Sequence, residues 1–477
     1  MTKLNKTRQF LLFTLAGILL FGCKVDDIVV PDNGKEKDPA NVWIDETMRR
    51  YYLWEDEIPA AEKLDYSAEA PAFFNAQLSL KDGKTREGSH HYYSSINKKT
   101  GATKTYMGDK DSFGFEFQYY HVNVQGSGTS FYALLTLYVL PNSPAEIAGI
   151  KRGEWIREIN NKPISGNADE LLATLASSKA SFGIAKDLQS SVSKRVELTA
   201  ATVIDDPVFL HKTFTNNQGK NIGYLVYNHF TAGLTDDDET FNDSMRKAFA
   251  DFKADGVNEF ILDLRYNGGG LVTSAQLLST MLAPASALND VFCFLKYNTK
   301  KQSYTDRRLY LDPKLYGTTG ANLDLKRIFV ITSRRTASAS EAVINSLKYY
   351  LGDQMILVGE LTEGKNVGSV TFKDDRYDWE LHPIVSKLFN KDEKTDYSDG
   401  FKPTYPCEET SQVDYYTLGD EQEFMLKQVL NFIKYGTPIN SGESKSLRSS
   451  DGHTLTPLYH SLDRKKTNGV VLDKQSL

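Results

Sequence analysis

The stretch "NEFILDLRYNGGGLVTSAQLLSTMLA", residues 258–283, decides the fold class. It opens with an apolar run of the length of one buried strand, turns at three consecutive glycines, and continues with apolar residues at helical spacing. Strands that alternate with helices in this way form mostly parallel sheets covered by helices. We therefore predict an α/β core and work outward from this unit.

The same rhythm recurs on both sides of this stretch. Three further short apolar runs are "NIGYLVY" (221–227), "RIFVIT" (327–332) and "MILVGE" (355–360). In open α/β sheets, functional groups gather where strands end and helices begin. We expect the core to cover residues 204–436 and its chemistry to lie in the loops that follow these strands.

The remaining segments differ from the core in composition. A chain of 477 residues is long enough for two or three structural units. Charged, proline-containing sequence is typical of a tether, whereas polar sequence without periodicity is typical of disorder. We predict a signal peptide over 1–22, a tether over 23–41, a small helical unit over 42–110, a strand-rich domain over 111–203 and a polar, disordered tail over 437–477.

The first residues predict export. Lys3, Lys6 and Arg8 precede an apolar run, 10–21, that is shorter than the roughly 20 residues of a membrane-spanning helix. The run ends in "LFGC", which resembles the lipobox of bacterial lipoproteins and implies lipid attachment at Cys23. We expect a protein of the bacterial cell envelope that is lipid-anchored to a membrane and faces the periplasm or the cell surface. A plain secreted or anchored segment is the alternative.

Charge and cysteine content exclude several classes of function. The formal net charge of −6 gives no basic surface, so nucleic acid is not an expected partner. Only Cys293 and Cys407 follow Cys23, which leaves no disulfide framework and no CxxC metal site. We expect two separate buried thiols, although a single pairing is possible. No metal and no cofactor is implied.

The stretch "TASASE", 336–341, carries a serine at a strand-to-helix junction. Ser338 and Glu341 form a capping-box pattern, so a helix start explains these residues by itself. A nucleophile is compatible with the same position, because the first N–H groups of a helix have no intrahelical partner and can hold an oxyanion. Two other loops bring suitable groups: the glycines of 268–270, whose N–H groups can be exposed, and Lys365 in "GELTEGKN".

In this order, "DLRYNGGGL", "TASASE" and "GELTEGKN" resemble the motifs of the C-terminal processing peptidases, also called tail-specific proteases. That family consists of serine peptidases with a Ser-Lys dyad on a ClpP/crotonase-like core. The resemblance implies Ser338 as nucleophile and Lys365 as general base. We expect the oxyanion donors to be the backbone N–H groups of Ala339 and of Gly269 or Gly270.

The predicted dyad places demands on the lysine. A lysine with the ordinary pKa of about 10.4 is a poor base at neutral pH, and burial can lower that pKa by up to about 3–5 units. We therefore predict that Lys365 is shielded, neutral and close to Ser338. Ser369 occupies the position where family members often carry a glutamine that orients the lysine, and it can supply such support over a shorter reach. A catalytically inactive, lipid-anchored peptide-binding protein is the alternative.

The segment "NSPAEIAGIKRGEWIREINNKPIS", 142–165, resembles a PDZ domain. PDZ domains bind an extended peptide as an added strand and hold its terminal carboxylate on backbone N–H groups. Phe113, Gly114 and Phe115 in "SFGFEF" look like that loop, although Glu116 replaces a glycine and its charge opposes a carboxylate. An ordinary alternating strand is the other interpretation. The expected partners are polypeptide substrates with extended C-termini, cleaved by a serine endopeptidase that recognises C-terminal or unfolded segments.

A nucleotide-binding function fits the same loop poorly. "GELTEGKN" matches the spacing of a P-loop and follows an apolar run. Asn366 replaces the residue that binds Mg²⁺, and Glu360 and Glu363 would place negative charge beside phosphates. We expect no nucleotide. His229, near the edge of the predicted site, fits a structural histidine better than a catalytic one.

Overall fold

A computed structural model describes residues 36–86, 88–99, 111–215, 219–235, 237–298, 307–409, 415–437, 452–465 and 470–471. The predicted signal peptide and Cys23 lie outside these residues, so the lipobox stays a prediction. Within the described ranges, no helix has both the length and the apolar character needed to cross a bilayer.

The core is a six-stranded sheet with the order β10-β11-β12-β15-β16-β21. Its strands are β10 (Val208–Thr215), β11 (Asn221–Tyr227), β12 (Glu259–Asp263), β15 (Ile328–Thr332), β16 (Met355–Gly359) and β21 (Tyr405–Pro406). All neighbours are parallel except β10 and β11. The predicted mostly parallel α/β core is confirmed.

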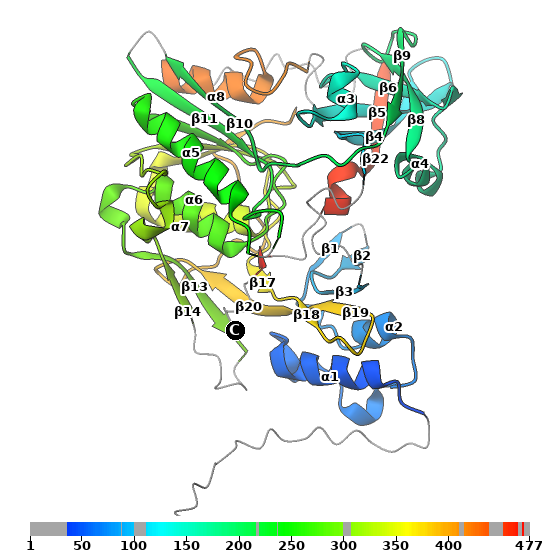
Figure 1. Cartoon of the computed structure of the whole chain (residues 1–477), viewed down its shortest axis with the longest axis vertical. Helices are drawn as coiled ribbons and strands as arrows, with labels where there is room; N and C mark the ends of the chain where they lie inside the picture. The colour runs from blue at the N-terminus through cyan, green and yellow to red at the C-terminus, as the bar shows by residue number, and fades with distance from the viewer. Residues whose placement is uncertain are drawn as a thin grey trace, which may run out of the picture.

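Helices cover both faces of this sheet (Figure 1). One face packs against α5 (Thr240–Ala254), α6 (Val272–Leu282) and α7 (Ala339–Leu351). The other face packs against α8 (Phe424–Tyr435). Burial on both faces explains why the central strands read as continuous apolar runs.

A second sheet lies against α6 and α7 on the side away from the first sheet. Its order is β14-β13-β20-β17-β23. The strands are β13 (Val291–Tyr297), β14 (Arg307–Tyr310), β17 (Val367–Ser369), β20 (Ile384–Phe389) and β23 (Val470–Val471). Cys293 and Cys407 are both free, as expected, but only Cys293 is buried, whereas Cys407 is half-buried.

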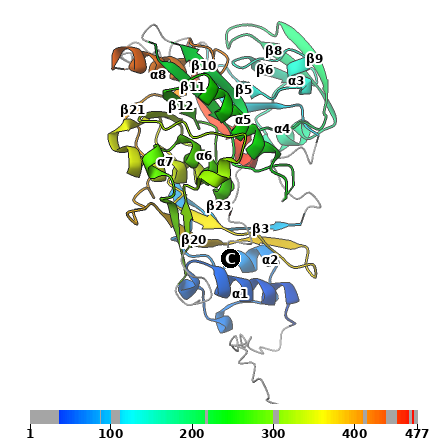
Figure 2. The ribbon, with the colours of Figure 1, turned by 60° about the vertical axis from the view of Figure 1, so that its left-hand side comes forward.

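The N-terminal unit packs beneath this second sheet in both views (Figures 1 and 2). It contains α1 (Pro39–Tyr51), α2 (Ala70–Asn75), β1 (Lys84–Arg86), β2 (Ser89–His91) and β3 (Ser95–Lys98). β3 pairs with β19 (Trp379–His382), which also pairs with β18 (Phe372–Lys373). The predicted boundary at residue 42 is wrong. α1 begins at Pro39, within the expected tether, because the Asp38 carboxylate accepts from the Ala40 N–H at 2.8 Å and caps the helix.

The strand-rich domain is the predicted PDZ unit, and its sheet has the order β22-β4-β5-β6-β8-β9, with β7 on β6. Its elements are β4 (Phe115–Val124), β5 (Ser130–Val139), α3 (Pro144–Ile147), β6 (Trp155–Ile159), β7 (Lys162–Pro163), α4 (Ala168–Leu175), β8 (Lys179–Ala185) and β9 (Lys194–Thr199). The first strand of the sheet, β22 (His453–His460), comes from the far end of the chain.

The prediction of a disordered tail over 437–477 is therefore wrong for its described part. β22 is followed by a 3₁₀-helix, η8 (Ser461–Lys465). The tail is polar, but Leu455 and Leu462 are buried, and β4 offers an open edge for backbone pairing. The polar composition of the tail hid the strand in the sequence. Pro457 lies within the strand. It is accommodated at a register shift on the outermost strand of the sheet.

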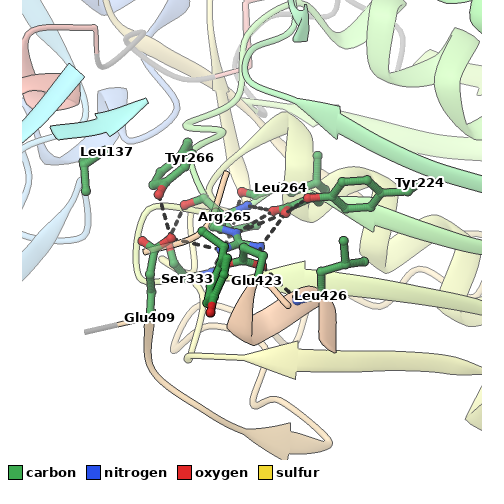
Figure 3. A network of polar contacts seen from close by, with 12 residues as sticks. Leu137, Tyr224, Leu264, Arg265, Tyr266, Ser333, Glu409, Glu423 and Leu426 are labelled. Atoms are coloured by element: carbon green, nitrogen blue, oxygen red, sulfur yellow. Dashed lines mark hydrogen bonds and ion pairs between the residues drawn. The ribbon is translucent and has the colours of Figure 1, made fainter. Parts of the chain in front are cut away.

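A buried guanidinium links the end of β12 to the start of α8 (Figure 3). Arg265 is 1% exposed, and its Nη2 lies 2.7 Å from Asp263 Oδ2 and 3.0 Å from Glu423 Oε2. Glu423 also accepts from the Leu426 N–H at 2.9 Å and so caps α8. Burial raises the pKa of Glu423, but the charge of Arg265 outweighs it and holds that pKa below its ordinary value. Removing either the Arg265 or the Glu423 side chain would leave the other as a buried charge that has lost a partner.

The PDZ unit joins the same network through Arg152, which precedes β6. Figure 3 shows the residues that the core contributes to this network, among them Arg265, Tyr266 and Glu409. Arg152 donates to Glu409 at 2.6 Å and to the Tyr266 hydroxyl at 2.7 Å. Glu409 also accepts from Arg265 at 2.9 Å. Burial raises the pKa of Glu409, yet the charges of Arg152 and Arg265 hold it at about 2. Buried charge therefore docks the PDZ unit on the segment that leads to the glycine turn.

Removing the charge of Arg152 should loosen this docking. We expect Arg152→Met to lower stability by about 3–5 kcal/mol, because Glu409 loses a buried partner. Arg195→Met is the matched control from the same domain. Its side chain is 54% exposed and pairs with Glu158, so we expect a cost of at most about 1 kcal/mol. Calorimetry measures both; equal costs would show that Arg152 does not secure the interface.

Candidate active site

Ser338 lies in the connection between β15 and α7, directly before α7 begins, at the carboxyl end of the parallel sheet. Its φ is +62° and its ψ is −113°, a conformation that favours glycine and is strained for serine. The residue is fully buried, and its Oγ has no hydrogen-bond partner among the described residues. A strained backbone at a serine on a strand-to-helix turn fits the nucleophile expected at this position, a role that stays a prediction.

The glycine turn packs directly on Ser338. A Cβ added to Gly269 would lie 2.7 Å from the Ser338 Cβ, so only glycine fits there. Gly270 pairs with Phe230 through bonds that use the Phe230 and Leu271 N–H groups, at 3.0 and 2.8 Å, and neither bond uses the Gly270 N–H. The structure thus brings the predicted glycines to the serine.

Asn267 organises this turn, and sequence reasoning missed it. Its Oδ1 accepts from the Gly269 N–H at 2.8 Å, and its Nδ2 donates to the Tyr227 carbonyl at 2.8 Å. The N–H group of Gly269 is therefore already engaged. Of the two glycines predicted as oxyanion donors, this favours Gly270, which would act beside Ala339, the first residue of α7. The signal in the sequence was an asparagine directly before the glycines.

Glu341 joins the serine to the lysine loop through one carboxylate. Its Oε2 accepts from the backbone N–H groups of Ser338 at 2.9 Å and Lys365 at 2.8 Å. Its Oε1 accepts from the Thr362 hydroxyl and the Gly364 N–H, both at 2.6 Å. The contact with Ser338 is the Glu341 half of the predicted capping box. The sequence had indicated a cap but not the link to Lys365.

Burial raises the pKa of Glu341 to about 7, against the opposing effect of its hydrogen-bond donors. The carboxylate is fully buried, so its charge is poorly solvated at neutral pH. A change of pH near neutrality therefore alters the group that holds the two loops together.

Lys365 is 7% exposed, so the expected shielding is present. Its Nζ lies 4.5 Å from the centre of the Tyr93 ring, which comes from the N-terminal unit. Tyr93 also donates to Glu363 Oε1 at 3.2 Å, while Arg86 and Lys84 hold the Glu363 side chain and carbonyl. The N-terminal unit thus shapes the lysine loop. The neutrality of Lys365 stays a prediction.

Ser369 lies on β17, four residues after the lysine, and is buried. Its backbone pairs with Val471 of β23. The support of Lys365 by Ser369 stays a prediction. The ring nitrogens of His229 contact Thr231 Oγ1 at 2.9 Å and the Asp205 carbonyl at 3.0 Å, which fits the structural role expected for it.

The predicted peptide-binding residues lie at the start of β4. Phe113 and Phe115 are buried, with ring centres 5.1 and 5.6 Å from that of Phe182. Gly114 has φ +82°, and a Cβ there would come within 2.1 Å of the Ser143 Cβ. Both phenylalanine side chains belong to the domain core. Peptide binding by this loop stays a prediction and would use its backbone groups.

A cleft of ≈ 780 Å³ lies between the core, the N-terminal unit and the PDZ unit and reaches Ala337, next to the buried Ser338, which is not part of its lining. Its lining includes Lys365, Ala337 and Gly268 from the core, Tyr93 from the N-terminal unit and Tyr120 from the PDZ unit. The cleft is therefore large enough for several residues of an extended chain.

A solved structure described as a putative S41 protease from Bacteroides fragilis NCTC 9343 matches with 34% identity and a TM-score of 0.72. The match covers 84% of this chain and 99% of that one. The chain belongs to peptidase family S41. Residues 221–406 of this S41 chain match Peptidase family S41, residues 40–95 the Peptidase S41 N-terminal domain, and residues 136–181 a PDZ domain.

Curated relatives of the S41 chain are more distant. The carboxyl-terminal-processing protease of Picosynechococcus sp. is 24% identical over 52% of this chain and 57% of its own length. The carboxy-terminal processing protease CtpA of Bacillus subtilis is 24% identical over 58% and 53%. The chain thus spans about half the length of the curated relatives it matches. The predicted resemblance is confirmed at the level of the family.

The raised pKa of Glu341 predicts a pH-dependent stability. In the unfolded chain the carboxyl ionises near 4.5, whereas the folded state keeps its proton up to about pH 7. The stabilising effect of this group is therefore complete below pH 4.5 and is lost as the pH rises to about 7. Glu341→Gln cannot titrate, so its difference from the parent in unfolding temperature should be larger at pH 5 than at pH 8. A constant difference would contradict the shift.

Proposed function

We propose that this protein is a serine endopeptidase in which Ser338 is the nucleophile and Lys365 the general base. The observation that carries the proposal is the Glu341 carboxylate, whose Oε2 accepts from the backbone N–H groups of both residues, at 2.9 and 2.8 Å. The strained backbone of Ser338 and the burial of Lys365 support the same roles.

Each step of the reaction conserves atoms and charge. Ser338 Oγ attacks the carbonyl carbon of a peptide bond while its proton passes to neutral Lys365 Nζ. The N–H groups of Ala339 and Gly270 stabilise the oxyanion. The C–N bond then breaks, the departing amine takes the proton from Nζ, and an acyl-enzyme remains on Oγ. Neutral Lys365 Nζ then takes a proton from water, whose oxygen attacks the ester carbonyl carbon. The ester C–O bond breaks, Ser338 Oγ recovers the proton from Nζ, and the new C-terminal carboxyl group leaves.

The substrates we propose are polypeptides whose C-terminal or unfolded segments the PDZ domain recognises. The PDZ match supports this, as do the relatives described as carboxyl-terminal-processing proteases. PDZ domains capture extended peptides along a strand edge. Here Gln118 and Tyr120 of β4, the strand whose outer edge β22 covers, contribute to the lining of the cleft.

A covalent probe tests the nucleophile without knowledge of the substrate. A fluorophosphonate should label Ser338, and Ser338→Ala should abolish labelling. Cleavage of unfolded casein should fall at least about a thousandfold in Ser338→Ala and in Lys365→Ala. The matched control is Ser340→Ala. That hydroxyl donates to the Asn267 carbonyl at 3.1 Å, and we expect its loss to change cleavage less than tenfold.

The outcomes separate the alternatives. Equal cleavage by parent and variants would exclude the Ser-Lys dyad. Absence of cleavage in all of them, with the chains folded, would favour a peptide-binding protein that has lost activity, the alternative that Ser369 raises.

We also propose that Cys23 carries a lipid that anchors the protein in the cell envelope. The motif "LFGC" after a charged and then apolar leader supports this. In a bacterial host, the parent should fractionate with membranes and Cys23→Ser should not acquire the lipid, as mass spectrometry of the N-terminal peptide would show. A parent chain without lipid would contradict the proposal.

A further inference from the structure

The chain's own C-terminal segment occupies the outer edge of the PDZ sheet (Figure 1). β22 pairs antiparallel with β4 from His453 opposite Val124 to His460 opposite Gln118. β4 is the strand that follows the Phe113–Gly114–Phe115 loop, and β22 runs toward that loop. A peptide bound by strand addition to a PDZ domain takes this edge. We infer that residues 453–463 are an internal ligand of the PDZ groove that a substrate segment must displace.

Side chains fit this segment into the groove. Tyr459 packs on the PDZ core, with its ring centre 6.3 Å from that of Phe117. Gln118 Nε2 donates to the Tyr459 carbonyl at 2.9 Å, and the Phe117 N–H donates to Ser461 Oγ at 2.8 Å. The contact therefore combines a backbone ladder with specific side-chain bonds, as a recognised peptide does.

The chemistry of the loop favours an internal segment over a free chain end. Glu116 is 1% exposed and accepts a hydrogen bond from the Ser461 hydroxyl. A terminal carboxylate at this point would meet a buried carboxylate instead of donors, which is unfavourable. A hydroxyl can donate to Glu116 and accept from the Phe117 N–H at the same time. The groove therefore selects an uncharged donor at the position of Ser461.

Beyond the groove the segment reaches the active site. Leu462 is buried with Tyr266, on the segment that leads to the glycine turn. Asp463 forms an ion pair with Arg335, three residues before Ser338. Farther along, the backbone of β23 pairs with β17, which closely follows Lys365. Since Tyr459 and Asp463 also line the cleft, release of the segment would free both the groove and part of the substrate path.

Peptide binding tests the internal ligand independently of catalysis. The probe is a fluorescent peptide of residues 452–463, "GHTLTPLYHSLD", added to the full chain carrying Ser338→Ala. The released version adds Leu455→Asp and Leu462→Asp, because burial of these carboxylates would expel the segment. The matched control adds Thr454→Asp and Thr456→Asp, which are exposed positions on the same strand. Thermal unfolding establishes that each version is folded.

We expect the released version to bind the peptide at least tenfold more tightly than the parent or the control. An equal affinity in parent and released version would overturn the proposal, as would absence of binding in a folded released version. If Leu455→Asp and Leu462→Asp unfold the chain, Tyr459→Ala with Ser461→Ala replaces them, and the same outcomes apply. A peptide that ends at Ser461 with a free carboxylate should bind more weakly than its amide.

The regulatory half of the inference rests on the proposed function. In chains that retain Ser338, the released version should cleave casein several-fold faster than the parent, and the control should match the parent. Tighter peptide binding by the released version without any cleavage would refute the peptidase while leaving the internal ligand intact. Tight peptide binding with unchanged cleavage would show that the segment fills the groove but does not restrain the enzyme.

Discussion

The carboxylate of Glu341 is the constraint on which the site depends. Ser338 and Lys365 follow different strands of one parallel sheet, and parallel order alone brings their loops only to the same edge. The four donors on Glu341 convert that proximity into a fixed spacing between two backbones. Loops of this kind would otherwise lose precision, and a dyad misplaced by about 1 Å can lose about a hundredfold in rate. The cost is a buried acid whose pKa of about 7 leaves its charge sensitive to pH.

Buried charge plays a second role farther from the serine. Arg265 anchors the start of the segment that ends in the glycine turn, and Arg152 brings the PDZ unit onto the same acids. Because these ions are shielded from water, breaking one pair strands its partners. The PDZ unit is thus held in one orientation relative to the turn that packs on Ser338. The outer strands of the PDZ sheet and the cleft that they help to line therefore keep a fixed position relative to each other.

Local patterns in the sequence were enough for the parallel core, the PDZ unit and the loops that hold Ser338, Gly270 and Lys365, because each depends on residues close together in the chain. The features that were missed depend on distant contacts. In the sequence, Glu341 could be recognised only as part of a helix cap, because its hydrogen bond to the Lys365 backbone forms only once the lysine loop has folded back. Arg152 and Glu409 are 257 residues apart. β22 was hidden by polar composition, because a strand that adds to an existing edge needs few apolar residues of its own.

Glu116 shows how one departure from a family pattern can change the ligand and not the fold. Its backbone belongs to β4, whose pairing with β5 shifts register between Glu116 and Phe117, so the domain accommodates the side chain in place of glycine. Its carboxylate is buried beside the loop that would otherwise receive a terminal carboxylate, and two like charges in that space would repel each other without solvent to screen them. The Ser461 hydroxyl removes this conflict because it donates to Glu116 and accepts from Phe117. The same replacement that weakens capture of a free chain end therefore makes the chain's own tail a suitable ligand.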